Sequence, residues 1–85
     1  MKRTHIKAFN ELKKLGCPVF VHHSAPDYFD ISAEESNSYQ WADYYSGDYN
    51  EGWIFGTHPT LDAVLRKHGL LAEWVNPAHL RVYEA

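Results

Sequence analysis

The stretch that decides the fold is Leu65-Arg66-Lys67-His68-Gly69, which repeats the pattern of Leu12-Lys13-Lys14-Leu15-Gly16 about fifty residues earlier. Each stretch closes a segment with the apolar spacing of an amphipathic helix. Basic residues in a last turn, followed by glycine, are typical of a helix C-terminus. Two short runs with strand character follow each glycine, so both halves of the chain predict the order helix, strand, strand.

The first half is expected to hold a helix over residues 4–15, with Thr4 as its N-cap. Its inward stripe is predicted to comprise the following apolar residues: Ile6, Ala8, Phe9, Leu12 and Leu15. β-branched and aromatic residues then predict strands over 18–23 and 28–33, joined as a hairpin through the turn at residues 24–27. A further strand is predicted over 39–45, before a turn at 46–48 and a short run at 53–55.

The second half begins at Pro59, which suits the first position of a helix, with Thr57 or His58 before it as the cap. The helix is predicted over residues 60–68, with Leu61, Val64 and Leu65 inward, and Gly69 ends it. Closing strands are expected at 71–75 and 80–83, around the turn dipeptide at 76–77.

The chain has 85 residues, of which 45% are hydrophobic and 22% are charged, a globular composition. This length predicts one domain over residues 1–85. We expect an α+β fold in which an antiparallel sheet of four to five strands carries both helices on one face. The other face of the sheet is expected to be open to solvent.

Charge is distributed unevenly along the sequence. No Lys or Arg occurs between Leu15 and Leu65, whereas eight carboxylates do. The net charge of the whole chain is −3. The carboxylates are Asp27, Asp30, Glu34, Glu35, Asp43, Asp48, Glu51 and Asp62. A surface of this sign repels nucleic-acid backbones and anionic lipid and attracts basic partners.

Residues 34–53 combine these acids with tyrosines, a composition that suits a protein contact surface. Trp41 and Trp53 are predicted to belong to the core. The expected partner-binding residues are Glu34, Glu35, Asp43, Tyr44, Tyr45, Asp48, Tyr49 and Glu51. The leading hypothesis is therefore a non-enzymatic protein without a cofactor that binds a basic protein.

A metal-dependent enzyme or metal-binding protein is a competing hypothesis, with His22, His23 and Asp27 as candidate ligands. Its weakness is spacing, because neighbouring strand residues point to opposite faces. Cys17 is a candidate nucleophile beside these histidines, although its place before a buried strand favours a packing role.

Direct nucleic-acid binding and carbohydrate binding are two further hypotheses, and each uses different residues. Nucleic-acid binding would use the basic first helix and its flank, namely Lys2, Arg3, Lys7, Lys13 and Lys14. Glycoside hydrolysis would use an acid pair, Asp27 with Asp30 or Glu34 with Glu35, and would stack the sugar on Trp41 and Trp53. Because a chain of this length cannot easily surround a substrate with both acids, a shallow, non-catalytic carbohydrate site is the alternative that remains.

A single cysteine excludes an intrachain disulfide and predicts a reducing, cytoplasmic location. No apolar run reaches the ~20 residues that span a bilayer, so no membrane association is expected. An exposed edge strand near the C-terminus would permit a homodimer.

In composition and charge layout alone, the chain resembles the small acidic inhibitors of phages and mobile elements. Some of these imitate nucleic acid and occupy a protein's DNA- or RNA-binding groove. The resemblance implies that the acids of residues 27–51 stand in for phosphates and that Tyr44, Tyr45 and Tyr49 make the central contacts.

Overall fold

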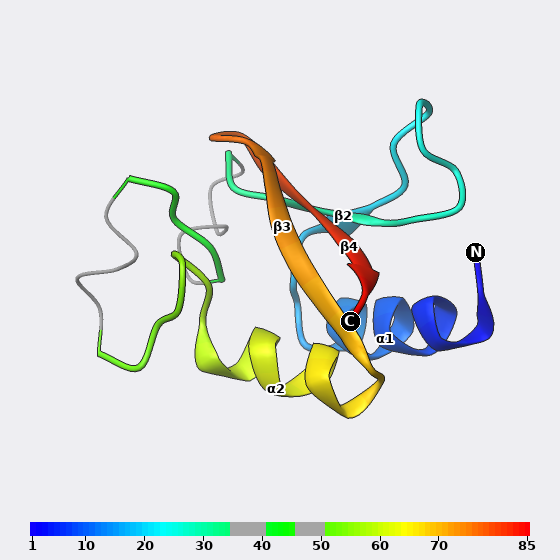
Figure 1. Ribbon diagram of the computed structural model, residues 1–85, viewed down its shortest axis with the longest axis horizontal. Helices are drawn as coiled ribbons and strands as arrows, with labels where there is room; N and C mark the ends of the chain where they lie inside the picture. Colours follow the sequence, from blue (N-terminus) through cyan, green and yellow to red (C-terminus); the bar gives the residue numbers. More distant parts are fainter. Residues whose placement is uncertain (35–40, 46–50) are drawn as a thin grey trace.

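The computed structural model describes residues 1–34, 41–45 and 51–85. In chain order, it contains two helices and four strands: α1 (Arg3–Lys14), β1 (Val19–Phe20), β2 (Asp30–Ser32), α2 (Pro59–Lys67), β3 (Leu70–Asn76) and β4 (His79–Glu84). Figure 1 shows both helices on the same side of the sheet. The predicted α+β class, with helix, strand, strand occurring twice, is confirmed.

The sheet has the strand order β1-β2-β4-β3, and every pair of neighbouring strands in it is antiparallel. β4 therefore lies between β2 and β3 and joins the two halves of the chain, with Ile31 of β2 paired with Leu80 of β4. Residues 41–45, the described part of the strand predicted over 39–45, do not form a strand. They make only an isolated bridge, between Ala42 and Thr57. The described sheet accordingly has four strands.

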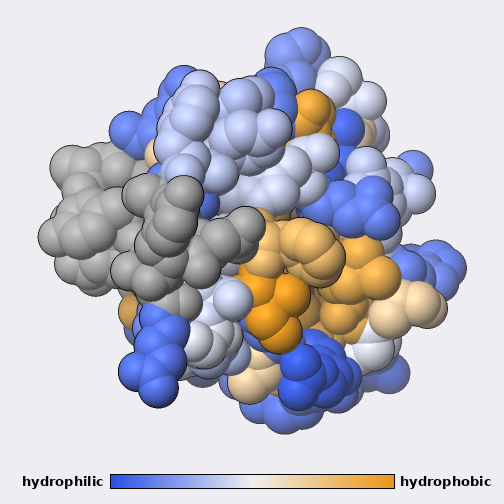
Figure 2. Space-filling view, turned by 60° about the vertical axis from the view of Figure 1, so that its left-hand side comes forward, coloured by the Kyte–Doolittle hydropathy of each residue, from blue (hydrophilic) through white to orange (hydrophobic). Residues whose placement is uncertain are grey.

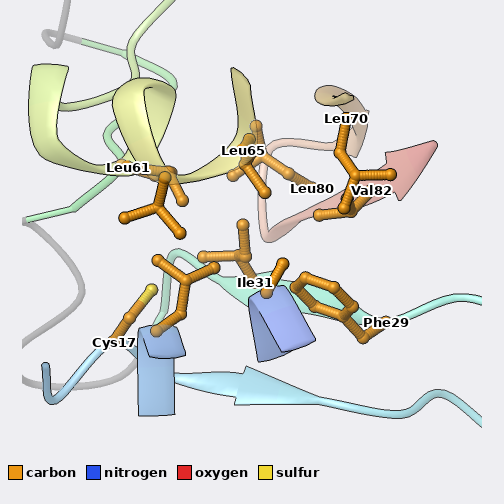
Figure 3. Packing of buried hydrophobic residues seen from close by; sticks show 12 residues of the cluster. Cys17, Phe29, Ile31, Leu61, Leu65, Leu70, Leu80 and Val82 are labelled. Atoms are coloured by element: carbon orange, nitrogen blue, oxygen red, sulfur yellow. The ribbon is translucent and has the colours of Figure 1, made fainter. Parts of the chain in front are cut away.

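The core lies between the helices and the sheet (Figure 3). Leu61 and Leu65 of α2 face Ile31, Leu80 and Val82 of the sheet, and all five are buried. Alternation along the strands sends these side chains to one face. The remaining members of the buried core are Ala8, Leu12, Cys17, Phe29, Ala42, Val64 and Leu70.

The inward face of α1 differs from the prediction at both of its ends. Ile6 and Leu15 are exposed, whereas His5 is buried, with 1% of its surface exposed. The His5 ring packs edge-on against Tyr28 and Phe29 of the chain leading into β2. Packing against these two rings therefore determines which face of α1 is buried. The predicted cap at Thr4 is also wrong, because the helix begins one residue earlier and Lys2 occupies the N-cap without a side-chain hydrogen bond.

The ends of α2 follow the prediction. His58 is the N-cap and its Nδ1 atom accepts a hydrogen bond of 2.9 Å from the Thr60 backbone. Pro59 lies at the start of the helix, and Gly69 follows it with φ +73°. This cap fixes the direction in which the preceding segment, residues 51–58, enters the fold.

Candidate functional site

Residues 41–45 are held in place by residues 56–58. The Asp43 backbone donates a 2.8 Å hydrogen bond to the Gly56 carbonyl, and the His58 backbone donates one of 2.9 Å to the Trp41 carbonyl. A Cβ atom on Gly56 would lie 2.5 Å from the Asp43 carbonyl oxygen, closer than real contacts allow. This approach therefore requires glycine, and it places Asp43 and the two tyrosines that follow it.

The supporting segment is itself anchored to α2 and β3. The Thr57 hydroxyl lies 2.7 Å from Asp62 Oδ1 of α2 and 2.6 Å from the Ile54 carbonyl oxygen, and its single proton is shared between these two acceptors. The Trp74 indole of β3 donates one of 2.7 Å to the Phe55 carbonyl. Residues 41–45 thus rest on a frame that is tied to both layers of the fold.

A groove of about 340 Å³ opens between residues 43–45, the end of β2 and the turn between β3 and β4. We call it the acidic groove; it is lined by Ala33, Glu34, Asp43, Tyr44, Tyr45, Asn76, Pro77 and Ala78. Two of these residues are carboxylates, and none is Lys or Arg. The described lining of the groove therefore carries net negative charge.

Two tyrosines form one side of the acidic groove. Tyr44 packs edge-on against Trp74, with ring centroids 5.2 Å apart, and remains 50% exposed. Tyr45 is 79% exposed and packs edge-on against Tyr44. The Asp43 Oδ1 atom accepts a 3.1 Å hydrogen bond from the Tyr45 backbone. Tyr44 is thus supported by β3, and Tyr45 presents most of its ring to solvent.

The structure brings together four residues of the predicted contact surface: Glu34, Asp43, Tyr44 and Tyr45. Glu51 is exposed in the following turn and does not line the groove. Three predicted residues, Glu35, Asp48 and Tyr49, lie outside the described residues. The sequence prediction did not include the wall formed by residues 76–78, which is the turn signalled by Asn76-Pro77.

The proposed metal ligands are placed differently from the sequence expectation. β1 ends at Phe20, so strand alternation does not separate His22 from His23, and their rings stack at 4.4 Å. Asp27 is exposed and lines a different pocket, beside His5 and Tyr28. Across the described ranges, no three His, Cys, Asp or Glu side chains gather closely enough to hold a metal ion.

Asp30 has a structural partner that the sequence pattern did not reveal. Its carboxylate is fully buried on the side of the sheet away from the helices, where it accepts two hydrogen bonds from Arg81, at 2.8 and 3.0 Å. These bonds raise the pKa of the Arg81 guanidinium above its ordinary range. His79 lies beside the pair, with Nε2 3.1 Å from Asp30 Oδ2 but no hydrogen bond. The carbohydrate interpretation that used Asp30 is therefore wrong, and this part of the second sheet face is not open.

Cys17 is buried, and burial raises the pKa of its thiol to about 12. A thiol with this pKa is almost entirely protonated at neutral pH, whereas a nucleophilic cysteine needs its thiolate. The residue belongs to the hydrophobic core, which is the packing role that its sequence context favours.

The basic residues of the first helix are exposed, but some bases of the chain are engaged with acids. Lys2 pairs with Glu84, and Lys67 pairs with Glu11 at 2.6 Å. Arg3, Lys7, Lys13 and Lys14 are the exposed bases of α1 itself. Hydrogen bonds from Lys67 and His68 lower the pKa of Glu11, so α1 carries an ionised carboxylate as well as its exposed bases.

No family model matches this chain, and neither a curated protein nor a solved structure is significantly similar to it.

Neither α1 nor α2 is long and apolar enough to cross a membrane, and the described residues contain no other helix.

Proposed function

We propose that this protein is a small, non-enzymatic binding protein whose acidic groove receives a basic segment of a partner protein. One observation carries the proposal: Glu34 and Asp43 converge with Tyr44 and Tyr45 on one groove whose described lining contains no basic residue. Carboxylates at such a surface form charge-assisted hydrogen bonds with Lys and Arg of a partner, and the groove holds no base that would repel them.

The two residue types would act at different ranges. Negative charge accelerates the approach of a cationic partner, and this effect weakens as salt shortens the Debye length. At contact, Arg or Lys would pair with Glu34 and pack over the ring of Tyr45, since a cation over an aromatic face is worth about 0.5–2 kcal/mol. Tyr44 is supported by Trp74, so this side of the groove loses little freedom on binding.

A finer version of the proposal identifies the partner as a nucleic-acid-binding protein and the chain as its inhibitor. Its support is the charge layout, because residues 15–65 contain eight acidic residues and no Lys or Arg. In this version the exposed acids among them, which do not include the buried Asp30, occupy the places of phosphates, and nucleic acid and this protein compete for the same basic groove of the partner. The single buried thiol supports a reducing, cytoplasmic compartment.

The proposal is tested with a fluorescein-labelled nona-arginine peptide as a probe of the groove, by fluorescence anisotropy. We expect Glu34→Lys to weaken binding by about tenfold, which corresponds to about 1.4 kcal/mol. Asp27→Lys is the matched control, since it makes the same charge change at an exposed acid outside the groove. It is expected to change the affinity by less than about threefold.

The same titration separates charge from contact. Binding of the wild-type protein should weaken between ionic strengths of about 0.01 and 0.15 M, where the Debye length falls from ~30 to ~8 Å. Tyr45→Ala should weaken binding by a factor that hardly depends on salt. Equal losses in Glu34→Lys and Asp27→Lys would show that the probe senses only net charge and would overturn the groove as the site.

A further inference from the structure

The turn at residues 54–57 has an unusual residue at its tip. Ile54 and Thr57 exchange backbone hydrogen bonds of 3.0 and 3.3 Å across two central residues, Phe55 and Gly56. Both central residues have positive φ, +51° for Phe55 and +79° for Gly56. Two-residue turns of this kind favour Asn-Gly, because an aromatic side chain is strained in the left-handed region. Phe55 therefore costs folding free energy where Asn would not.

The monomer gains little burial in return for this strain. The Phe55 side chain is 80% exposed, and the neighbouring Ile54 is 52% exposed. The turn is fixed from behind by the hydrogen bond from the Trp74 indole to the Phe55 carbonyl. Phe55 is thus a rigidly placed aromatic residue that projects from the fold, and strain of this kind is concentrated at functional positions.

An apolar cleft of about 340 Å³ lies directly beside this turn, between α2 and β3. Leu65, Leu70 and Leu80 are among its lining residues, and so is Leu71, which is 37% exposed. Figure 2 shows apolar side chains gathered on this face of the molecule, with strongly hydrophilic residues along the lower rim. The face thus carries both a protruding apolar group and a cavity able to receive one.

The cleft also contains one acid and one base, both on α2. The Oδ1 atom of Asp62 accepts a hydrogen bond from the Thr57 hydroxyl, but its Oδ2 atom is buried without a hydrogen-bond partner in the described residues. Arg66 follows four positions later, lines the same cleft and is exposed. A buried acceptor without a donor is costly, so a donor from outside the chain would stabilise Asp62 Oδ2.

We propose that a second copy of this chain covers the cleft in a two-fold symmetric dimer. Phe55 of each copy enters the cleft of the other, and each Arg66 approaches Asp62 of the other. A two-fold interface requires a self-complementary patch. This patch meets the requirement, because it contains both the Phe55 ring and the cleft that receives it, and both Arg66 and Asp62. The outer edge of β3, one of the two terminal strands of the described sheet, borders the same patch and extends the contact.

The dimer is independent of the proposed function. The residues that line the cleft and those that line the acidic groove do not overlap. The two sites touch through Trp74 of the cleft, which packs against Tyr44 of the groove, but each proposal has its own test, and either can fail without the other.

The test is sedimentation velocity of the full chain from low to high micromolar concentration. The wild-type protein is expected to form a dimer with increasing concentration. Phe55→Asn removes the protruding ring and restores the residue that the turn prefers, so it should fold at least as stably as the wild type at low concentration. We expect it to weaken dimerisation at least tenfold.

Arg66→Glu tests the polar pair, and Lys7→Glu on the exposed face of α1 is its control with the same charge change. Arg66→Glu should weaken dimerisation about tenfold, and Lys7→Glu should leave it unchanged. A wild-type protein that stays monomeric throughout the range overturns the proposal. So does a Phe55→Asn variant that dimerises as tightly as the wild type, or an equal effect of the two charge variants.

Discussion

Replacing Arg81 with methionine removes the guanidinium that is hydrogen-bonded to the buried Asp30 carboxylate and leaves His79, with Nε2 3.1 Å from Asp30 Oδ2, beside it. Asp30 is fully buried and accepts hydrogen bonds of 2.8 and 3.0 Å from the Arg81 guanidinium, whose side chain is itself 15% exposed. Breaking a buried pair by removing one partner costs about 3–5 kcal/mol. A domain of this length has a total stability of roughly 4–13 kcal/mol, at about 0.05–0.15 kcal/mol per residue.

The loss is measured by urea unfolding at low protein concentration, followed by circular dichroism. With a slope of about 1 kcal/mol per molar urea for a small domain, Arg81→Met should lower the midpoint by about 3–5 M. The control is Arg3→Met, which removes an exposed arginine and should change the free energy of unfolding by less than about 0.5 kcal/mol.

A double variant, Asp30→Leu with Arg81→Met, tests the cause. Replacing both members of a buried pair by apolar residues is often close to neutral, so the double variant should recover most of the lost stability. An Arg81→Met protein within about 1 kcal/mol of the wild type would refute the reasoning. So would a double variant that is no more stable than the single one.

Three further measurements test different parts of the fold. Gly56→Ala should lower the free energy of unfolding by about 2–5 kcal/mol in urea, because its Cβ would lie 2.5 Å from the Asp43 carbonyl oxygen. Gly16→Ala is the control: it has open space around it and should lose only about 1–3 kcal/mol, from its positive φ. Similar losses in the two variants would contradict the close approach at Gly56. Burial raises the pKa of Asp62 above 3.8, so its stabilising contribution is full below pH 3.8 and is lost as pH rises through the folded-state pKa. The wild type should therefore lose thermal stability relative to Asp62→Asn as pH rises above 3.8, and a difference that does not change with pH would contradict this. Cys17, with a thiol pKa of about 12, should react with iodoacetamide at neutral pH only as fast as the protein opens, and reaction at the rate of a free thiol would contradict its burial.

Local signals were sufficient for α2 and for the order of the elements. Pro59 and Gly69 act through their own backbone restrictions, so a sequence pattern can predict where this helix begins and ends. The face of α1 could not be predicted as well. His5 rather than Ile6 is buried because the rings of Tyr28 and Phe29 lie against that side of the helix, and this contact depends on the hairpin that follows.

The acidic groove was partly predictable. The charge pattern selected Glu34 and Asp43, because a segment without Lys or Arg is visible in the sequence itself, and the tyrosine content of the segment selected Tyr45. The wall at residues 76–78 was not predictable, since its position beside them follows from β4 lying between β2 and β3. The Asp30–Arg81 pair has the same origin: the two residues are 51 positions apart and meet only in this strand order.

The most direct test of the central claim is a titration of the ¹⁵N-labelled protein with nona-arginine, followed by amide chemical shifts. The account predicts that the largest shifts occur at the amides of Glu34, residues 43–45, Asn76 and Ala78, and that Asp27 and the first helix stay unperturbed. Shifts spread evenly over all exposed acids, or concentrated away from the acidic groove, would contradict it.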